Sequence, residues 1–122
     1  MTTLEVGTKL VELINAMDMA TIYGTLYSPD IVSIESLKDG ETKEFVGMGA
    51  MDEKNAEWET MFDMKSWKTE GPFPNGNEFA LFFELELIHK ASGQPVTMKE
   101  IALYTVVNDL IVRERFFYVW EN

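Results

Sequence analysis

The sequence has 122 residues, the length of one ordinary domain, and 46% of them are hydrophobic. Its 10 Lys and Arg and 21 Asp and Glu leave a net charge of −11, which would repel a nucleic-acid backbone or an anionic membrane surface. Because the chain has no Cys and one His, it is a poor candidate for a zinc site, an iron–sulfur cluster or a thiolate nucleophile, and a serine triad would need His89.

Targeting and membrane signals are also missing from the pattern. No run approaches eighteen apolar residues, and the N-terminus lacks the basic start of a signal peptide. We therefore expect one domain over residues 1–122 in the cytoplasm, without cofactor or metal, and with neither nucleic acid nor membrane as a partner. Any chemistry must then use carboxylates and tyrosines.

Two helices are expected at the start of the chain. The first covers about fourteen residues, because apolar side chains recur at spacings of three and four. Its apolar stripe consists of Leu4, Leu10, Val11, Ile14 and Met17. Asp18 then stands as an N-cap acceptor for a short second helix, which Ser28-Pro29 brings to an end.

A hairpin and a third helix follow. The β-branched run from Ile31 to Glu35 predicts a strand, and a turn at residues 38–41 leads to a second strand at Phe45-Val46. The third helix is expected to begin near Gly49. One of its faces carries Met51, Lys54, Asn55, Trp58, Met61 and Phe62.

The second half of the chain contains only strand patterns. Turn signals at Asn75-Gly76-Asn77, Ser92-Gly93 and Asn108-Asp109 separate long runs of alternating side chains. Such a pattern is typical of an antiparallel meander.

One carboxylate interrupts the apolar face of that meander. If Ser92-Gly93 is a two-residue turn, Leu85 faces Glu100, and Phe83 and Tyr104 share the same face. Glu100 then lies among apolar neighbours that offer it no charge partner.

The last strand has two conceivable registers. A two-residue turn at Asn108-Asp109 with an unbroken ladder would point Arg113 and Arg115 toward the apolar face, and burying two guanidinium groups costs several kcal/mol. We therefore expect a three-residue turn or a bulge instead. The side chains that this arrangement brings inward are Glu114, Phe116 and Tyr118.

Three segments carry a family resemblance: YSPDIVSIES at 27–36, the Gly47-Met48-Gly49 start of the third helix, and DLIVRERFFYVW at 109–120. With the order of elements, they resemble the SnoaL-like branch of the NTF2-like superfamily over nearly the whole chain. The resemblance implies an α+β cone, in which a curved antiparallel sheet wraps around three N-terminal helices and encloses a cavity for a small hydrophobic ligand. It also implies a homodimer. Because the fold serves isomerases, cyclases, hydratases and binding modules, it selects no single reaction.

The resemblance further implies positions for a site. Glu35 is similar to the general base that ketosteroid-isomerase-like members carry on the first strand, and Tyr27 is similar to their pocket tyrosine after the second helix. Glu114 and Tyr118 match pocket positions of the last strand.

The oxyanion donors of those members do not transfer. Leu10 and Ala102 stand where the family carries a tyrosine and an acid. Glu100 precedes Ala102 by two residues and lies on the same face, so it is a candidate to replace the acid that the family carries at the Ala102 position.

Each candidate carboxylate has a second interpretation. Glu35 lies either in the cavity or in water. Glu100 is either a desolvated acid with a raised pKa, or it reaches a tyrosine or lies at an open rim. Glu114 lies in the pocket, in water or at a dimer interface.

Two functions fit these observations. The first is a cofactor-free isomerase, cyclase or hydratase that acts on a small apolar carbonyl compound, with Glu35, Glu100 and Glu114 as catalytic candidates. The second is a non-catalytic module that binds a ligand or a partner protein. Under both, the residues expected to line the cavity are Tyr27, Trp58, Phe83, Tyr104, Phe116 and Tyr118.

The opposite face of the meander predicts a homodimer. It carries an apolar set that is too large to leave in water. The set consists of Phe82, Ile88, Ile101 and Leu103.

Overall fold

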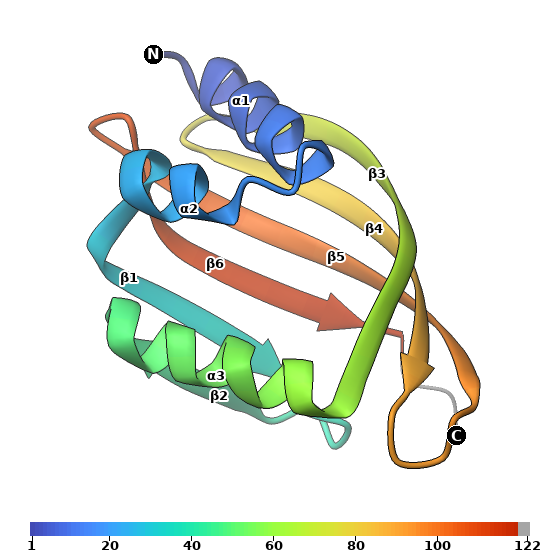
Figure 1. The fold of residues 1–122 in the computed structure, drawn as a ribbon. Helices are drawn as coiled ribbons and strands as arrows, with labels where there is room; N and C mark the ends of the chain where they lie inside the picture. Colours follow the sequence, from blue (N-terminus) through green and yellow to red (C-terminus); the bar gives the residue numbers. More distant parts are fainter. Residues whose placement is uncertain (120–122) are drawn as a thin grey trace.

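The computed structural model describes residues 1–119, so Trp120 at the end of the last-strand motif lies outside the described residues. Three helical segments, the second of which is an α-helix that continues as a π-helix, precede most of the sheet, and six strands form it (Figure 1). The elements are α1 (Thr3–Asn15), α2 (Met19–Thr21), the π-helix η1 (Ile22–Leu26), β1 (Tyr27–Ser36), β2 (Thr42–Val46), α3 (Met48–Met61), β3 (Phe62–Asn75), β4 (Glu78–His89), β5 (Pro95–Val107) and β6 (Leu110–Tyr118).

Helix α1 forms over most of the predicted stripe but ends at Asn15, so Met17, which has a positive φ of 57° and is 66% exposed, lies beyond it. Thr2 and Glu5 close a capping box at its start, which satisfies two backbone amides that the helix itself leaves free. Gly7 allows α1 to lie close to the sheet, because a Cβ at this position would come within 2.8 Å of the Pro72 Cβ. The first helix is therefore fixed against β3 and β4 by a close backbone approach.

The second helical segment is short, as expected, and Asp18 caps it. The Asp18 carboxylate accepts hydrogen bonds from the backbone amide and the hydroxyl of Thr21, at 3.2 and 2.6 Å. The helical path ends at Leu26. Tyr27 and the Ser28-Pro29 pair that follows it already belong to β1, so the strand begins earlier than the β-branched run indicated.

The sheet is mixed rather than wholly antiparallel, which corrects one part of the expected architecture. Its strand order is β2-β1-β6-β5-β4-β3, and β1 runs parallel to β6 while all other neighbours are antiparallel. A hairpin forces its two strands to be antiparallel, but β1 and β6 are joined through the whole meander, so no turn fixes their relative direction. The predicted α+β cone is otherwise confirmed.

The β4–β5 register differs by two residues from the prediction. Glu100 faces Phe83, and Leu85 faces Met98. The reason is the connection, which is not a two-residue turn: the backbone amide of His89 bonds the carbonyl of Gln94, so the loop includes residues 90–94. A slip of two residues keeps every side chain on its predicted face, because side chains alternate with a period of two.

The last strand contains the predicted bulge. Asn108 and Asp109 form a two-residue turn in which both have positive φ, 50° and 68°. The register then shifts between Thr105 and Val106, which leaves Val112 as the extra residue of β6. Glu114 is thereby turned inward, and it is only 3% exposed.

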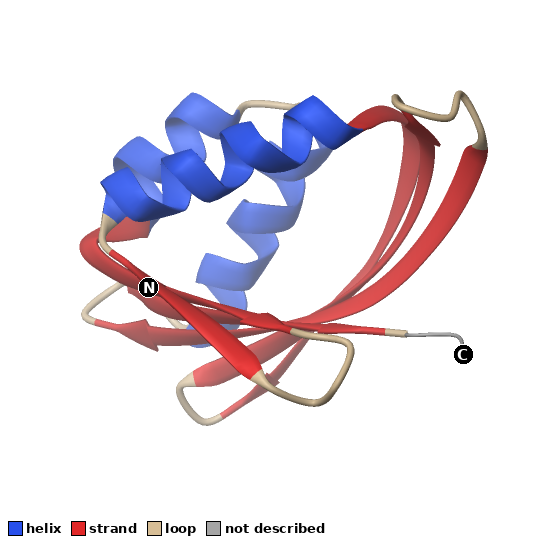
Figure 2. Ribbon diagram, turned by 90° about the horizontal axis from the view of Figure 1, so that it is seen from below, coloured by secondary structure: helices blue, strands red, loops and turns tan. Residues whose placement is uncertain are grey.

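The sheet curves around the helices on one side and leaves its other face uncovered (Figure 2). The tightest packing lies where α1 and η1 meet the sheet. Fully buried side chains there include Val6, Leu10, Ile22, Phe79 and Leu81. Within residues 1–119 no helix is long and apolar enough to cross a membrane.

Candidate functional site

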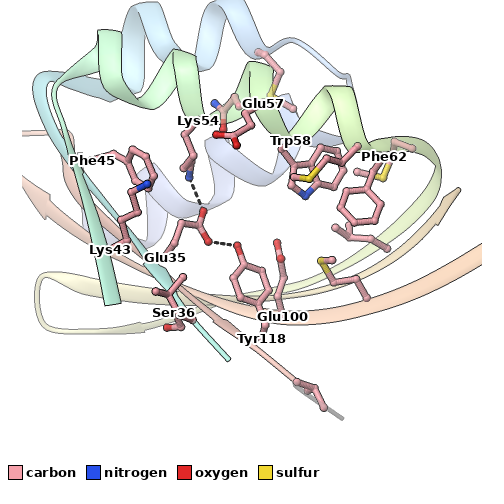
Figure 3. Close-up of a pocket in the computed structure, with 18 residues that line it drawn as sticks. Glu35, Ser36, Lys43, Phe45, Lys54, Glu57, Trp58, Phe62, Glu100 and Tyr118 are labelled. Carbon is pink, nitrogen blue, oxygen red and sulfur yellow. Dashed lines mark hydrogen bonds and ion pairs between the residues drawn. The ribbon is translucent and has the colours of Figure 1, made fainter. Parts of the chain in front are cut away.

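A cavity of about 650 Å³ lies between α3 and the strands β1, β5 and β6. Its floor carries Glu35, Tyr118 and Glu100 side by side, and Lys54 and Trp58 reach down toward them from α3 (Figure 3). Glu100 faces Tyr118 across the β5–β6 ladder, which explains their proximity although they are distant in sequence. The remaining lining is mostly apolar, and its volume is in the range of ligand sites.

Lys54 forms an ion pair with Glu35. The Lys54 Nζ lies 2.7 Å from the Glu35 Oε1 and 2.9 Å from the Ser33 Oγ. It also lies 4.7 Å from the centroid of the Phe116 ring, a cation–π distance. Only 13% of the lysine side chain is exposed, so this ammonium is held in place by several partners at once.

Tyr118 completes the environment of Glu35. Its hydroxyl donates a hydrogen bond to the Glu35 Oε2, so each carboxylate oxygen has a partner. Burial, with the negative charges of Glu100 and Glu35, raises the pKa of Tyr118. Tyr118 therefore stays a donor, and the Glu35 carboxylate is held in place by one cation and one hydroxyl.

Glu100 has a different environment. Within residues 1–119, no hydrogen bond or ion pair reaches its carboxyl group. Burial, together with the negative charge of Glu35, raises the pKa of Glu100 from 4.5 to about 7, against the opposing charge of Lys54. A carboxyl group of this kind can keep its proton near neutral pH and can donate it to a ligand.

Glu114 lies deeper than the cavity. Its carboxylate accepts hydrogen bonds from the hydroxyls of Tyr27 and Ser33, the latter at 2.8 Å, and the Lys54 Nζ lies 3.8 Å away. Burial raises the pKa of Glu114, whereas Lys54 and the two hydroxyls lower it. The Lys54 ammonium thus lies close to both carboxylates, to Glu35 on the floor of the cavity and to Glu114 beneath that floor.

The predicted site residues fall into two groups, those that line a cavity and those that are buried away from it. In the first group, Glu35, Glu100, Trp58 and Tyr118 line the first cavity. Phe83 and Phe116, also in this group, line an adjoining cavity.

Tyr27, Tyr104 and Glu114 belong to the second group, because they are buried and are not among the lining residues of either cavity. Tyr104 stacks on Phe79 with ring centroids 4.8 Å apart. The structure thus places Tyr27 and Tyr104 in the core rather than at the cavity wall, because other side chains of the core pack around them.

Sequence reasoning did not select Lys54 or Ser33 as site residues. The signal for Lys54 was present, since it is a charged residue on the face of α3 that also carries Met51 and Trp58. Ser33 gave no signal, because a serine in a strand is common on either face. No group of three or more His, Cys, Asp or Glu side chains in residues 1–119 is arranged to hold a metal ion.

Comparisons with known proteins agree with this architecture. The structure of a candidate SnoaL-like polyketide cyclase from Mesorhizobium loti is 36% identical, with a TM-score of 0.86, and the match covers 97% of this chain and all of that one. A candidate isomerase from Bacillus subtilis has the same fold at 15% identity, with a TM-score of 0.78 over 98% of this chain and 90% of its own.

An NTF2-like protein of unknown function from Burkholderia pseudomallei is 13% identical, with a TM-score of 0.78 over 98% of this chain and 92% of its own. No curated protein matches the sequence. The family model for the SnoaL-like domain matches residues 1–118. The chain therefore belongs to the SnoaL-like domain family.

Proposed function

We propose that the protein is a cofactor-free enzyme of the isomerase, cyclase or hydratase kind, which moves a proton on a small apolar carbonyl compound. The observation that carries the proposal is the pair of unequal carboxyl groups in one apolar cavity. Glu35 forms an ion pair with Lys54, whereas Glu100 has no hydrogen-bond or ion-pair partner among residues 1–119 and a pKa of about 7. Two carboxyl groups whose environments differ in this way are suited to act as base and acid.

Glu35 is the base in this scheme. It takes a proton from the carbon next to the carbonyl group, and the C–H electron pair forms the carbon–carbon double bond of an enol. Glu100 donates its proton to the carbonyl oxygen, on which negative charge would otherwise develop. Return of a proton to another carbon gives an isomer, and attack of the enol on a second carbonyl group gives a ring.

Lys54 and Tyr118 act as positioning residues. Both bind Glu35, and they hold it beside Glu100 on the floor of the cavity (Figure 3). The apolar walls keep the local dielectric low, so these charges interact more strongly than they would in water. The neighbours described as a polyketide cyclase and an isomerase support the class of reaction without identifying a substrate.

Exchange of deuterium into 2-tetralone tests the proposal, because enolisation is the step that all these reactions share. In D2O, followed by NMR, the wild-type protein should accelerate exchange at the carbons beside the carbonyl group. Glu35→Gln should lose about 100-fold or more of that acceleration, since a missing general base typically costs 10²–10⁴. Glu44→Gln, an exposed acid on β2, is the matched control and should behave as wild type.

Two results would reject the enzymatic proposal. One is that the wild type does not accelerate exchange although 2-tetralone binds, which would leave the alternative of a non-catalytic ligand-binding module. The other is that Glu35→Gln exchanges as fast as the wild type.

We also propose a homodimer in the cytoplasm, formed through the uncovered face of the sheet. Phe82, Ile101 and Phe117 face one another in a row across three strands of that face, and Ile101 and Phe117 are 47% and 39% exposed. A contiguous apolar row of this kind is typical of an interface. Sedimentation equilibrium at micromolar concentration should give twice the chain mass, and a monomer would contradict the proposal.

A further inference from the structure

A second cavity, of about 750 Å³, adjoins the first. The two share part of their lining, including Trp58, Phe62, Leu85 and Glu100. Since the same side chains form walls of both, the two spaces lie next to each other at Glu100.

Helix α3 separates the upper parts of these spaces. Asp52, Ala56 and Glu59 line only the second cavity, whereas Lys54, Glu57 and Met61 line only the first. At 3.6 residues per turn these two sets lie on opposite sides of the helix. Asn55 and Trp58 lie between them and line both cavities.

The geometry points to one continuous binding site that runs beneath α3 and takes an elongated ligand. We infer that its carbonyl end lies at Glu35 and Glu100, while an uncharged ring or alkyl tail lies in the second cavity. The position of the reactive end rests on the proposed function, but the second subsite rests on the shape of the cavities alone.

The walls of the second cavity suit a flat apolar group. Trp67 of β3, Met17 of the α1–α2 connection and Met19 at the start of α2 line it, and Met19 also lines the first cavity. Met17 and Met19 are 66% and 43% exposed, so they stand at an opening to solvent and can adapt to the shape of a ligand. The Trp67 ring is oriented by a hydrogen bond of 3.3 Å from its Nε1 to the Asn15 Oδ1.

Charge determines which tails this subsite accepts. Asp52, Glu59 and Asp63 stand among its lining residues. The one lysine in that lining, Lys90, donates from its Nζ to the Glu59 carbonyl oxygen at 2.7 Å. A carboxylate or phosphate at the end of the tail would meet net negative charge, so the ligand class is neutral and elongated.

Three probes and two variants test this inference by isothermal calorimetry. The probes are 2-tetralone, 6-phenyl-2-tetralone and 6-(4-carboxyphenyl)-2-tetralone. Ala56→Trp fills the second cavity from an exposed helix position, and Leu37→Trp is its counterpart at the exposed rim of the first. Because both positions are exposed, neither variant should impair folding, and circular dichroism would verify this.

We expect Ala56→Trp to weaken the binding of 6-phenyl-2-tetralone about tenfold or more and to leave 2-tetralone within about twofold. Leu37→Trp should weaken both, and the carboxylated probe should bind the wild type more weakly than its parent. The inference is overturned if Ala56→Trp affects the short and long probes equally or affects neither, or if the carboxylate does not weaken binding. If the wild type does not accelerate deuterium exchange but Ala56→Trp still weakens only the long probe, the proposed function is rejected and the second subsite is retained.

Discussion

Glu114 and Glu100 project from neighbouring strands onto the same face of the sheet, and yet their environments are opposite. Glu114 is 3% exposed, accepts from two hydroxyls and lies near the Lys54 ammonium. Glu100 faces Phe83 of β4 and Tyr118 of β6, and no hydrogen bond or ion pair reaches its carboxyl group from residues 1–119. Burial alone therefore does not make a carboxyl group reactive, because a buried group with satisfied hydrogen bonds is part of the scaffold.

The surroundings of the two residues differ in the same way. Near Glu114 the cone is filled by its own side chains, such as Phe79 stacked on Tyr104. Near Glu100 the helices stand away from the sheet and leave two cavities. We therefore expect the closed part of the cone to contribute more to stability than the open part does.

The largest expected effect compares one aromatic residue from each part. Phe79→Ala should lower the free energy of unfolding by about 3–5 kcal/mol, because Phe79 is fully buried and its truncation leaves a void. Trp58→Ala should cost less, about 1–2 kcal/mol, since the ring already borders a cavity. Urea unfolding measures both. Equal losses would mean that the open part of the cone is packed as tightly as the closed part.

A second prediction concerns the hydrogen bonds of Glu114. Glu114→Leu removes the acceptor of the Tyr27 and Ser33 hydroxyls, which then remain buried and poorly satisfied. We expect a loss of about 2–4 kcal/mol at neutral pH, in line with the cost of orphaned buried donors. Urea unfolding of this variant beside Tyr27→Phe separates the loss of the acceptor from the loss of one donor. No loss in Glu114→Leu would contradict a structural role for this residue.

The third prediction is a substitution that raises the free energy of unfolding instead of lowering it. The pKa of Glu100 is about 7 in the folded protein and lies near 4.5 in the unfolded chain. Between these pH values the folded state keeps a proton that the unfolded state has released, so the contribution of Glu100 to stability falls as the pH rises. Glu100→Gln should therefore gain stability over the wild type through this window, by roughly 2–3 kcal/mol at pH 8. Unfolding measured from pH 4 to pH 8 would reveal a constant difference if Glu100 titrates normally.

The smallest expected effect is on the pH profile of the proposed reaction. Since Glu100 donates as a protonated acid, exchange of 2-tetralone should decline above pH 7, by about tenfold for each pH unit at most. An amide also donates a hydrogen bond but does not titrate, so Glu100→Gln should be slower at pH 6 and flat across pH 7. A decline that persists unchanged in this variant would assign the titration to another group.

The sequence determined the elements and the faces of this protein. Helix α1 and the alternation along β4, β5 and β6 follow from local spacing, because a helix or strand repeats its side-chain directions over a few residues. The bulge in β6 was also predictable, since the alternative would have buried Arg113 and Arg115. Glu100 was recognisable as an anomaly on an apolar face for the same local reason.

Only the tertiary structure decided which of these side chains meet. The Tyr27 hydroxyl reaches Glu114 across 87 positions of sequence, and Tyr118 reaches Glu35 across 83. The position of Lys54 beside Glu35 depends on how α3 crosses the sheet, and the empty space beneath α3 depends on where the helices stand away from the strands. Local spacing gives the direction of a side chain relative to its own element, but the distance between two elements depends on the packing of the whole chain.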